Sequence, residues 1–152
     1  MIHKAVCLLR AGGVSGVIKF EQSYGGTGTR VFGEIRGLTD GLHGFHIHEW
    51  GDLTDGCESA GAHYNPLGNA HGGLGTKIRH LGDLGNVQSS GGMCLVNIFV
   101  AGLSLTGPYS VVGRSLIVHA DRDDLGEGGH PLSKTTGNSG GRVACGVIGL
   151  AK

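Results

Sequence analysis

The sequence predicts an all-β protein, an eight-stranded sandwich or barrel with two long functional loops, formed by a single domain over residues 1–152. Three observations support this fold class. Short apolar runs with a period of two recur along the chain, and turn-forming residues separate them. Helical periodicity is not sustained over even 11 residues anywhere in the sequence. Glycine is frequent, with 32 residues and no Gly-X-Y period, which favours many tight turns between strands over a collagen-like chain.

The expected strands follow one another in short segments. Residues 5–9 are apolar on both faces, so we expect this first strand to be largely buried. Val14, Gly16, Ile18 and Phe20 line one face of the second strand, opposite mostly polar residues. Further strands are expected at 31–36, 44–49, 93–100, 115–119 and 142–150.

Two long stretches, 51–85 and 120–141, do not fit a strand pattern. Loops of that length inside a compact domain usually serve a function, and something must hold them in place. The first stretch contains several residues that can bind a metal or form a disulfide. These are Cys57, His63, His71, His80 and Asp83.

Composition excludes several classes of protein. Twelve basic and 12 acidic side chains give a formal net charge of zero, and no basic stripe indicates a nucleic acid or an anionic membrane as a partner. The apolar run at the N-terminus is too short for a signal peptide, and no run approaches the length of a membrane span. We therefore expect a cytoplasmic protein. Four cysteines are too few for a disulfide scaffold.

Nine histidines are many for a neutral chain of this size, and six of them form a pattern with one aspartate. The members are His46, His48, His63, His71, His80, Asp83 and His119. His46 and His48 lie two apart in an expected strand, so both imidazoles point to the same face. Alone, such a pair is most simply a pair of solvated surface residues. Its combination with four more histidines and Asp83, gathered largely in a loop that lacks a scaffold, indicates a metal site instead.

Ligand chemistry divides this set between two metals. Sites made only of imidazoles suit copper, whereas three imidazoles and one carboxylate suit zinc. The six histidines and one aspartate complete two four-ligand sites only when one histidine binds both ions. A fully deprotonated imidazole can do so, and it would hold the two metals roughly 6 Å apart because metal–nitrogen distances are about 2 Å.

Long motifs throughout the chain resemble copper–zinc superoxide dismutase of the eukaryotic cytosolic type. They are GLHGFHIHE (41–49), CESAGAHYNP (57–66), HGG (71–73), RHLGDLGN (79–86), VH (118–119), DDLG (123–126) and GNSGGRVACGVIG (137–149). The resemblance covers essentially the whole chain. It implies an eight-stranded Greek-key barrel, in agreement with the strand pattern.

The resemblance also assigns the two metals to particular residues. It implies copper on His46, His48, His63 and His119. It implies zinc on His63, His71, His80 and Asp83, so that His63 bridges the two ions. Asp123 would accept hydrogen bonds from one copper-site and one zinc-site histidine and so fix their tautomers.

The cysteines are assigned in the same way. The resemblance implies a disulfide between Cys57 and Cys145, which would contribute at most about 4–5 kcal/mol in the chain-entropy description. Its more useful role would be to anchor the metal-bearing loop to the final strand. Cys7 and Cys94 would be free thiols that pack as small apolar side chains.

Three histidines lie outside the ligand set. By the resemblance, His43 would be a structural, hydrogen-bonded residue rather than a ligand. His3 and His130 match no motif, and we expect both to be exposed to solvent.

The implied activity is the dismutation of superoxide to dioxygen and hydrogen peroxide. Copper would alternate between Cu(II) and Cu(I), Arg142 would hold the anion beside it, and His63 would carry a proton to the peroxide. Zinc has no redox chemistry and would keep the bridging histidine oriented. A copper chaperone is a candidate partner for metal loading.

Two other functions fit the sequence less well than dismutation. A copper-delivery domain without enzymatic activity would resemble this chain, but such domains tend to lose copper ligands or the guiding arginine, and both are kept here. A β-domain stabilised by zinc alone would leave His46, His48 and His119 unexplained.

One segment departs from the family pattern. Residues 129–135 read GHPLSKT, and they lack the pair of acids that many family members carry there. The lysine of this segment, Lys134, lies one place earlier than in those members. Lys134 is therefore a candidate steering residue for an anionic substrate.

A homodimer is expected by the same resemblance. Trp50, Gly51, Gly113 and Leu150 fall where eukaryotic-type members pair, and their small or apolar character suits a close-packed, two-fold contact. The sequence leaves open whether Trp50 belongs to this contact or to the core.

Overall fold

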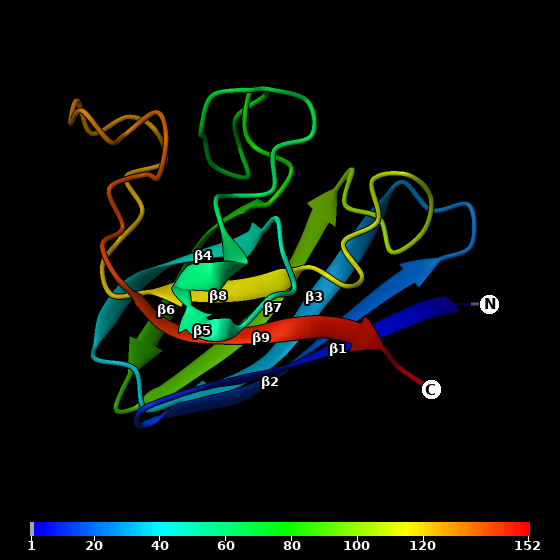
Figure 1. The fold of residues 1–152 in the computed structure, drawn as a ribbon, viewed down its shortest axis with the longest axis horizontal. Coiled ribbons are helices and arrows are strands. Elements are labelled where there is room, and N and C mark those ends of the chain that lie inside the picture. Colours follow the sequence, from blue (N-terminus) through cyan, green and yellow to red (C-terminus); the bar gives the residue numbers. More distant parts are fainter. Residues whose placement is uncertain (1) are drawn as a thin grey trace.

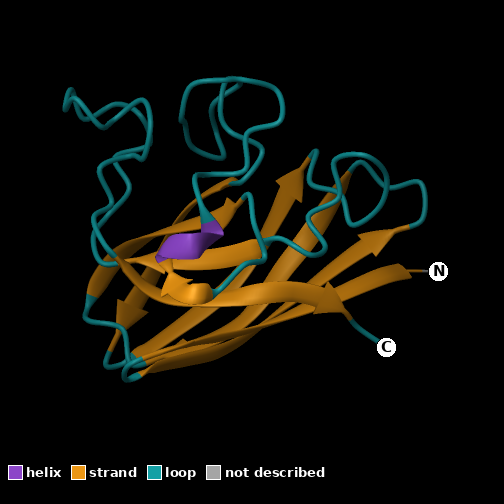
Figure 2. Cartoon of the chain, in the orientation of Figure 1, coloured by secondary structure: helices purple, strands orange, loops and turns teal. Residues whose placement is uncertain are grey.

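The computed structural model describes residues 2–152, and in this range eight antiparallel strands form a closed barrel (Figures 1 and 2). The elements are β1 (Ile2–Ala11), β2 (Val14–Ser23), β3 (Gly28–Arg36), β4 (Gly41–His48), β5 (Thr54–Cys57), the 3-10 helix η1 (Glu58–Ala60), β6 (Asp83–Ser90), β7 (Met93–Ala101), β8 (Ser115–His119) and β9 (Arg142–Leu150). Only β5 and η1 lie outside the ring of strands in the part of the chain that is described.

The strands follow the order β1-β2-β3-β7-β6-β4-β8-β9 around the barrel. The neighbours β3 and β7, and likewise β4 and β8, are not consecutive among the barrel strands, so the chain crosses over between them. This combination of hairpins and crossovers is a Greek-key arrangement. The predicted fold class is confirmed.

Alternate residues of the strands fill the barrel interior. Ile18 and Phe20 are fully buried, which confirms the predicted inward face of β2. In β1, Cys7 and Leu9 are also fully buried, but Leu8 is 52% exposed. The prediction that both faces of this strand are buried is therefore wrong, because β1 keeps a strict inside–outside alternation and presents apolar side chains to the exterior.

Most predicted strand bounds are close to those observed. β8 and β9 match their predicted ranges, and β7 extends one residue further, to Ala101. β3 begins three residues earlier than expected, and β4 is displaced toward the N-terminus.

The sequence pattern did not predict β6. Its large apolar side chains are few, and Gly85 interrupts it with a φ of 79°, so the alternation is too weak to read. As a result Asp83 is the first residue of a barrel strand rather than a loop residue, and the first long loop ends at residue 82.

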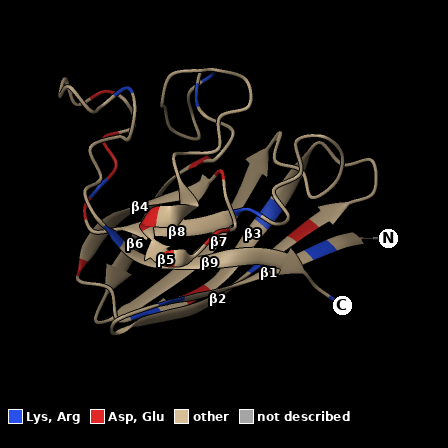
Figure 3. Cartoon of the chain, in the orientation of Figure 1, with Lys and Arg blue, Asp and Glu red and all other residues tan. Residues whose placement is uncertain are grey.

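The two long loops, coloured green and orange in Figure 1, stand over the same side of the barrel beyond β4 and β8. A backbone hydrogen bond connects them, since the His71 N–H donates to the Lys134 carbonyl over 2.9 Å. Basic and acidic residues are interspersed along the chain (Figure 3). None of the described helical segments is long and apolar enough to cross a membrane.

Candidate metal centre

β4 presents two buried histidines to the space beneath the loops. His46 and His48 are at most 1% exposed, and both lie opposite β8 in the ladder, where His46 pairs with Ile117 and His48 with Ser115. The register of β4 against β6 shifts between Gly44 and His46, and after this bulge His46 lies opposite Asp83. The local irregularity thus brings a strand histidine next to the carboxylate of β6.

A first group of four imidazoles converges beside β4 and β8. Donor atoms of His46, His48, His63 and His119 all lie within 4.8 Å of one another, and all four residues are buried. The Nε2 atoms of His48 and His119 are 3.3 Å apart. This group consists only of imidazoles, the donor set that suits copper.

Hydrogen bonds to the outer nitrogens fix the orientation of three of these rings. His46 donates from Nε2 to Asp123 over 2.6 Å, which leaves Nδ1 for the group. His48 and His119 donate from Nδ1 to the carbonyls of Gly61 and Gly140, at 2.8 Å and 3.1 Å, which leaves Nε2. Each ring therefore presents a defined nitrogen, as ligating histidines do.

A second group surrounds the Asp83 carboxylate. Its Oδ1 atom lies 3.0 Å from His63 Nδ1, 2.9 Å from His71 Nδ1 and 3.3 Å from His80 Nδ1. Its Oδ2 atom accepts the backbone N–H groups of Gly72 and His80, at 3.0 Å and 2.8 Å. Three imidazoles and one carboxylate are a donor set that suits zinc.

His63 faces both groups. Its Nδ1 atom lies among the donors around Asp83, 3.1 Å from His80 Nδ1. Its Nε2 atom is buried without a hydrogen-bond partner among the described residues, and the ring centroid is 4.1 Å from that of His46. His46 Nδ1 and His71 Nδ1 likewise lack a partner with hydrogen-bond geometry in residues 2–152. Buried nitrogens without partners are costly, so these three atoms fit metal coordination.

Asp123 connects the two groups from outside. Its two carboxylate oxygens accept from His46 Nε2 and from His71 Nε2, at 2.6 Å and 2.7 Å. Asn86 holds the Asp123 backbone with two hydrogen bonds, to its N–H and its carbonyl, at 2.7 Å and 2.9 Å. Gly137 has a φ of 71° and packs so closely on Asp123 and His71 that a Cβ atom there would overlap both.

The environment keeps most of these histidines neutral. Burial lowers the pKa of His46 to about 3 and that of His119 to about 4, and it also lowers the pKa of His48 and His63. Burial likewise acts to lower the pKa of His71, but the hydrogen bond to Asp123 and the Asp83 carboxylate beside Nδ1 raise it to about 9. Neutral imidazole is the form that binds a metal, so the first group is ready for coordination at neutral pH.

Comparison with known families agrees with this geometry. The family model described as copper/zinc superoxide dismutase matches residues 14–148. The chain belongs to the copper/zinc superoxide dismutase family. The match covers nearly the whole barrel and both loops, and it confirms the resemblance found in the sequence motifs.

Other family features are present as expected. Cys57 and Cys145, 88 residues apart, form a disulfide. Cys7 and Cys94 are free and buried, and burial raises the pKa of the Cys7 thiol to about 12, which makes it an inert packing residue. His43 is 2% exposed, so its predicted structural role is confirmed.

The three histidines outside the two donor groups can also be compared with the expectations from the sequence. His43 Nδ1 and Nε2 bond the carbonyls of His119 and Thr39, both over 2.8 Å. His130 is exposed as expected, whereas His3 is only partly exposed because its ring lies 4.1 Å from that of Tyr24. Sequence reasoning did not identify Asn86, because its role depends on contacts with a loop 37 residues away.

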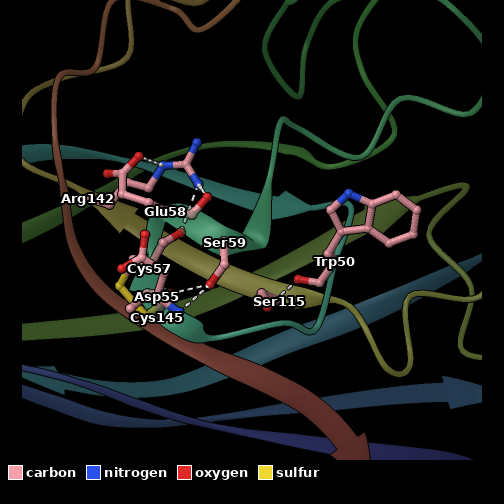
Figure 4. The surroundings of a disulfide bond; sticks show 9 residues. Trp50, Asp55, Cys57, Glu58, Ser59, Ser115, Arg142 and Cys145 are labelled. Carbon is pink, nitrogen blue, oxygen red and sulfur yellow. Dashed lines mark hydrogen bonds and ion pairs between the residues drawn. A yellow bond between two sulfur atoms is a disulfide. The ribbon is translucent and has the colours of Figure 1, made fainter.

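An open channel of about 900 Å³ leads to the first group in this dismutase-family chain. His48, His63 and His119 line it, together with Arg142 and Lys134. Arg142, the first residue of β9, donates from Nη1 to the Cys57 carbonyl over 2.9 Å (Figure 4). Arg142 shares the channel lining with His48 and His119. Burial lowers the pKa of both rings, and the positive charge of Arg142 adds to this effect.

Proposed function

We propose that this protein is a copper–zinc superoxide dismutase. The observation that carries the proposal is a pair of adjacent donor groups that both contain His63, the all-imidazole group and the group around Asp83. A donor nitrogen of His46 also lies within 4.8 Å of the donors of His63, His71 and Asp83, but its ring belongs to the all-imidazole group, which lies at the end of a channel lined by Arg142. The proposed copper ligands are His46, His48, His63 and His119. The proposed zinc ligands are His63, His71, His80 and Asp83.

Copper bound to the four imidazoles would supply one-electron redox chemistry, so that two superoxide ions and two protons give dioxygen and hydrogen peroxide. Arg142 would dock the anion. Its Nη1 atom is engaged with backbone carbonyls, and its Nη2 atom has no hydrogen-bond partner in the described part of the chain. A guanidinium held in this way keeps its charge and offers donors to an oxygen anion.

His63 would hold the transferred proton. Its Nε2 atom is buried without a hydrogen-bond partner among the described residues, and the residue lines the channel. Asp83, whose pKa is lowered by its hydrogen bonds to His63, His71 and His80 despite burial, keeps Nδ1 of this ring oriented toward the second group. The nitrogen that takes up and returns the proton is therefore Nε2. Zinc has no redox chemistry, so its role would be structural.

The direct test loads the purified protein with copper and zinc, measures both metals, and follows superoxide decay on the same sample. We expect about one of each ion per chain and a rate that requires copper. A fully loaded protein that leaves the decay of superoxide unchanged would contradict the proposal. If that protein passed copper to an acceptor instead, the copper-delivery function would take its place.

Rates at increasing ionic strength test electrostatic guidance of superoxide. We expect the rate to fall as salt is added, because exposed charges are screened beyond about 8–10 Å. Lys134, which is exposed and lines the channel, should contribute part of this dependence, so Lys134→Gln should flatten it modestly. Arg142→Ala should lower the rate about tenfold or more at all salt concentrations. A wild-type rate that does not respond to salt would remove the guidance role and leave Arg142 as a docking group.

We also propose that the protein is a homodimer. Leu8, Val17, Trp50, Val147 and Leu150 are between 41% and 81% exposed, so Trp50 is not a core residue. Leu8 pairs with Val17 across β1 and β2, and β9, which carries Val147 and Leu150, pairs with β1 on its other side. A contiguous apolar surface of this kind suits a two-fold contact.

The small residues named from the sequence lie in the same surface. Gly51 packs on the Gly113 carbonyl and lies beside Val147, since a Cβ atom built on Gly51 would be 3.5 Å from Val147 Cγ1.

The resemblance to cytosolic family members is the support for a cytoplasmic location and for loading by a copper chaperone.

Sedimentation of the wild type should give twice the mass of one chain at micromolar concentration. Val147→Asp should shift the equilibrium toward single chains, because it places two charges in a two-fold contact. The matched control is Leu95→Asp, which adds the same charge at a 71% exposed leucine on β7, outside this surface. A wild type that sediments as one chain would remove the dimer.

A further inference from the structure

A carboxylate stands beside the arginine of the channel. The Glu58 Oε2 atom lies 4.0 Å from Arg142 Nε, and the Glu58 side chain is 74% exposed whereas that of Arg142 is 18% exposed. Both residues line the channel, and Figure 4 shows them next to each other above the disulfide. An approaching anion therefore meets the Glu58 carboxylate together with the guanidinium.

The backbone holds this pair together. Glu58 begins η1 directly after Cys57, and Cys57 is joined by its disulfide to Cys145, three residues after Arg142 in β9. Arg142 Nη1 also donates to the Cys57 and Glu58 carbonyls, at 2.9 Å and 3.5 Å. The arginine thus keeps its place through backbone contacts, and the Glu58 side chain adds only a charge.

The charges along the channel balance. Its lining contains two basic residues, Arg142 and Lys134, and two acidic residues, Glu49 and Glu58. Of the two acids, Glu58 is the one with an ion-pair contact to Arg142 within the described chain. Its removal would leave an excess of one positive charge around the entrance.

We infer that Glu58 is a specificity-determining residue, which keeps divalent oxyanions such as orthophosphate off Arg142 while it admits monovalent anions. A lone guanidinium binds phosphate strongly because its donors match two oxygens at once. The repulsion from Glu58 doubles when the charge of the anion doubles, since Coulomb energy is proportional to charge. This role rests on the proposed function only in that superoxide is the monovalent anion to be admitted.

The size of the effect follows from charge and distance. Two unit charges roughly 6 Å apart in water interact weakly, and removing one raises the affinity for a monovalent anion about threefold at low ionic strength. The same change raises the affinity for a divalent anion about tenfold. The ratio of the two affinities, rather than either value alone, measures the selectivity.

The test titrates the metal-loaded, reduced protein with orthophosphate and with formate at low salt and a pH where phosphate is divalent. Binding is followed by NMR at the Arg142 Nε–H and at the Glu58 amide, which requires no dismutation. In Glu58→Gln we expect phosphate to bind about tenfold more tightly and formate about threefold. Asp55→Asn is the matched control, because it removes one charge from β5, three residues away and outside the channel lining.

Two results would overturn the inference. One is an equal gain in affinity for phosphate and for formate in Glu58→Gln. The other is a gain in phosphate affinity in Asp55→Asn as large as that in Glu58→Gln. Loss of both bindings in Arg142→Gln would support the arginine as the site of binding. A protein that shows the expected selectivity but does not dismutate superoxide would contradict the proposed function and leave the role of Glu58 intact.

Discussion

Changing His119 to alanine should abolish dismutation and leave the barrel folded. His119 ends β8, is 4% exposed, and presents Nε2 to the all-imidazole group. Loss of one of four copper donors should lower the rate by more than about a hundredfold, the upper end of the loss seen when a residue that only orients a ligand is changed. The fold should persist, because the barrel core lies on the other side of the strand and does not include this ring.

Copper content, zinc content and superoxide decay should be measured on the same sample, and the fold checked by circular dichroism. His130→Ala is the matched control, since His130 is an exposed histidine in the long loop that follows β8 and lies in neither donor group. His46→Ala should also abolish the rate, but it frees Asp123 as well and so reports on both groups. A His119→Ala protein with wild-type copper content and rate would refute the assignment.

The paired ligands on β4 were predictable because a strand has a fixed period. His46 and His48 had to share a face, and both are buried on the inner side of the site. The composition of the whole donor set was equally readable, since six imidazoles and one carboxylate indicate a copper-like and a zinc-like group, whereas the family resemblance assigned each histidine to one of them. Sequence could therefore name the candidate ligands before their contacts were known.

Residues that act through long-range contacts could not be found in this way. Asn86 holds the Asp123 backbone across 37 residues, and its place depends on β6, a strand too weakly patterned to predict. The proposed role of Glu58 depends on its proximity to Arg142, and the disulfide between Cys57 and Cys145 holds their two segments together. Local periodicity carries no information on such contacts between distant segments.

The exposed face of β1 is a second case in which the sequence does not predict what a residue contacts. Leu8 is apolar, yet it lies on the outer surface with Val17. An apolar residue in a strand predicts burial, but the sequence does not say whether the partner is the core of the chain or a second protein. The alternation of apolar residues in β1 was predicted correctly, and only the predicted burial of its outer face was wrong.

Changing Asp83 to alanine should have the largest effect on stability. Asp83 is fully buried, and its Oδ2 atom accepts the N–H groups of Gly72 and His80. Each unpaired buried N–H costs about 1–3 kcal/mol, so the metal-free variant should lose about 3–5 kcal/mol of unfolding free energy. For a chain of this size the melting temperature should then fall by about 10–15 °C. Calorimetry of the metal-free wild type and variant measures this difference.

Zinc should widen that difference, because an ion that binds only the folded state stabilises it by an amount that grows with the logarithm of its affinity. Asp83→Asn separates the two effects: its amide oxygen can still accept a backbone N–H, but it no longer offers an anionic ligand to the second group. We expect the asparagine variant to melt near the wild type without zinc and well below it with zinc. Without zinc, amide exchange in residues 58–82 should rise in the alanine variant and stay near the wild-type rate in the asparagine variant, since Oδ2 of Asp83 connects this loop to β6. An alanine variant that binds zinc and melts as the wild type does would show that Asp83 is neither a ligand nor an anchor of the loop.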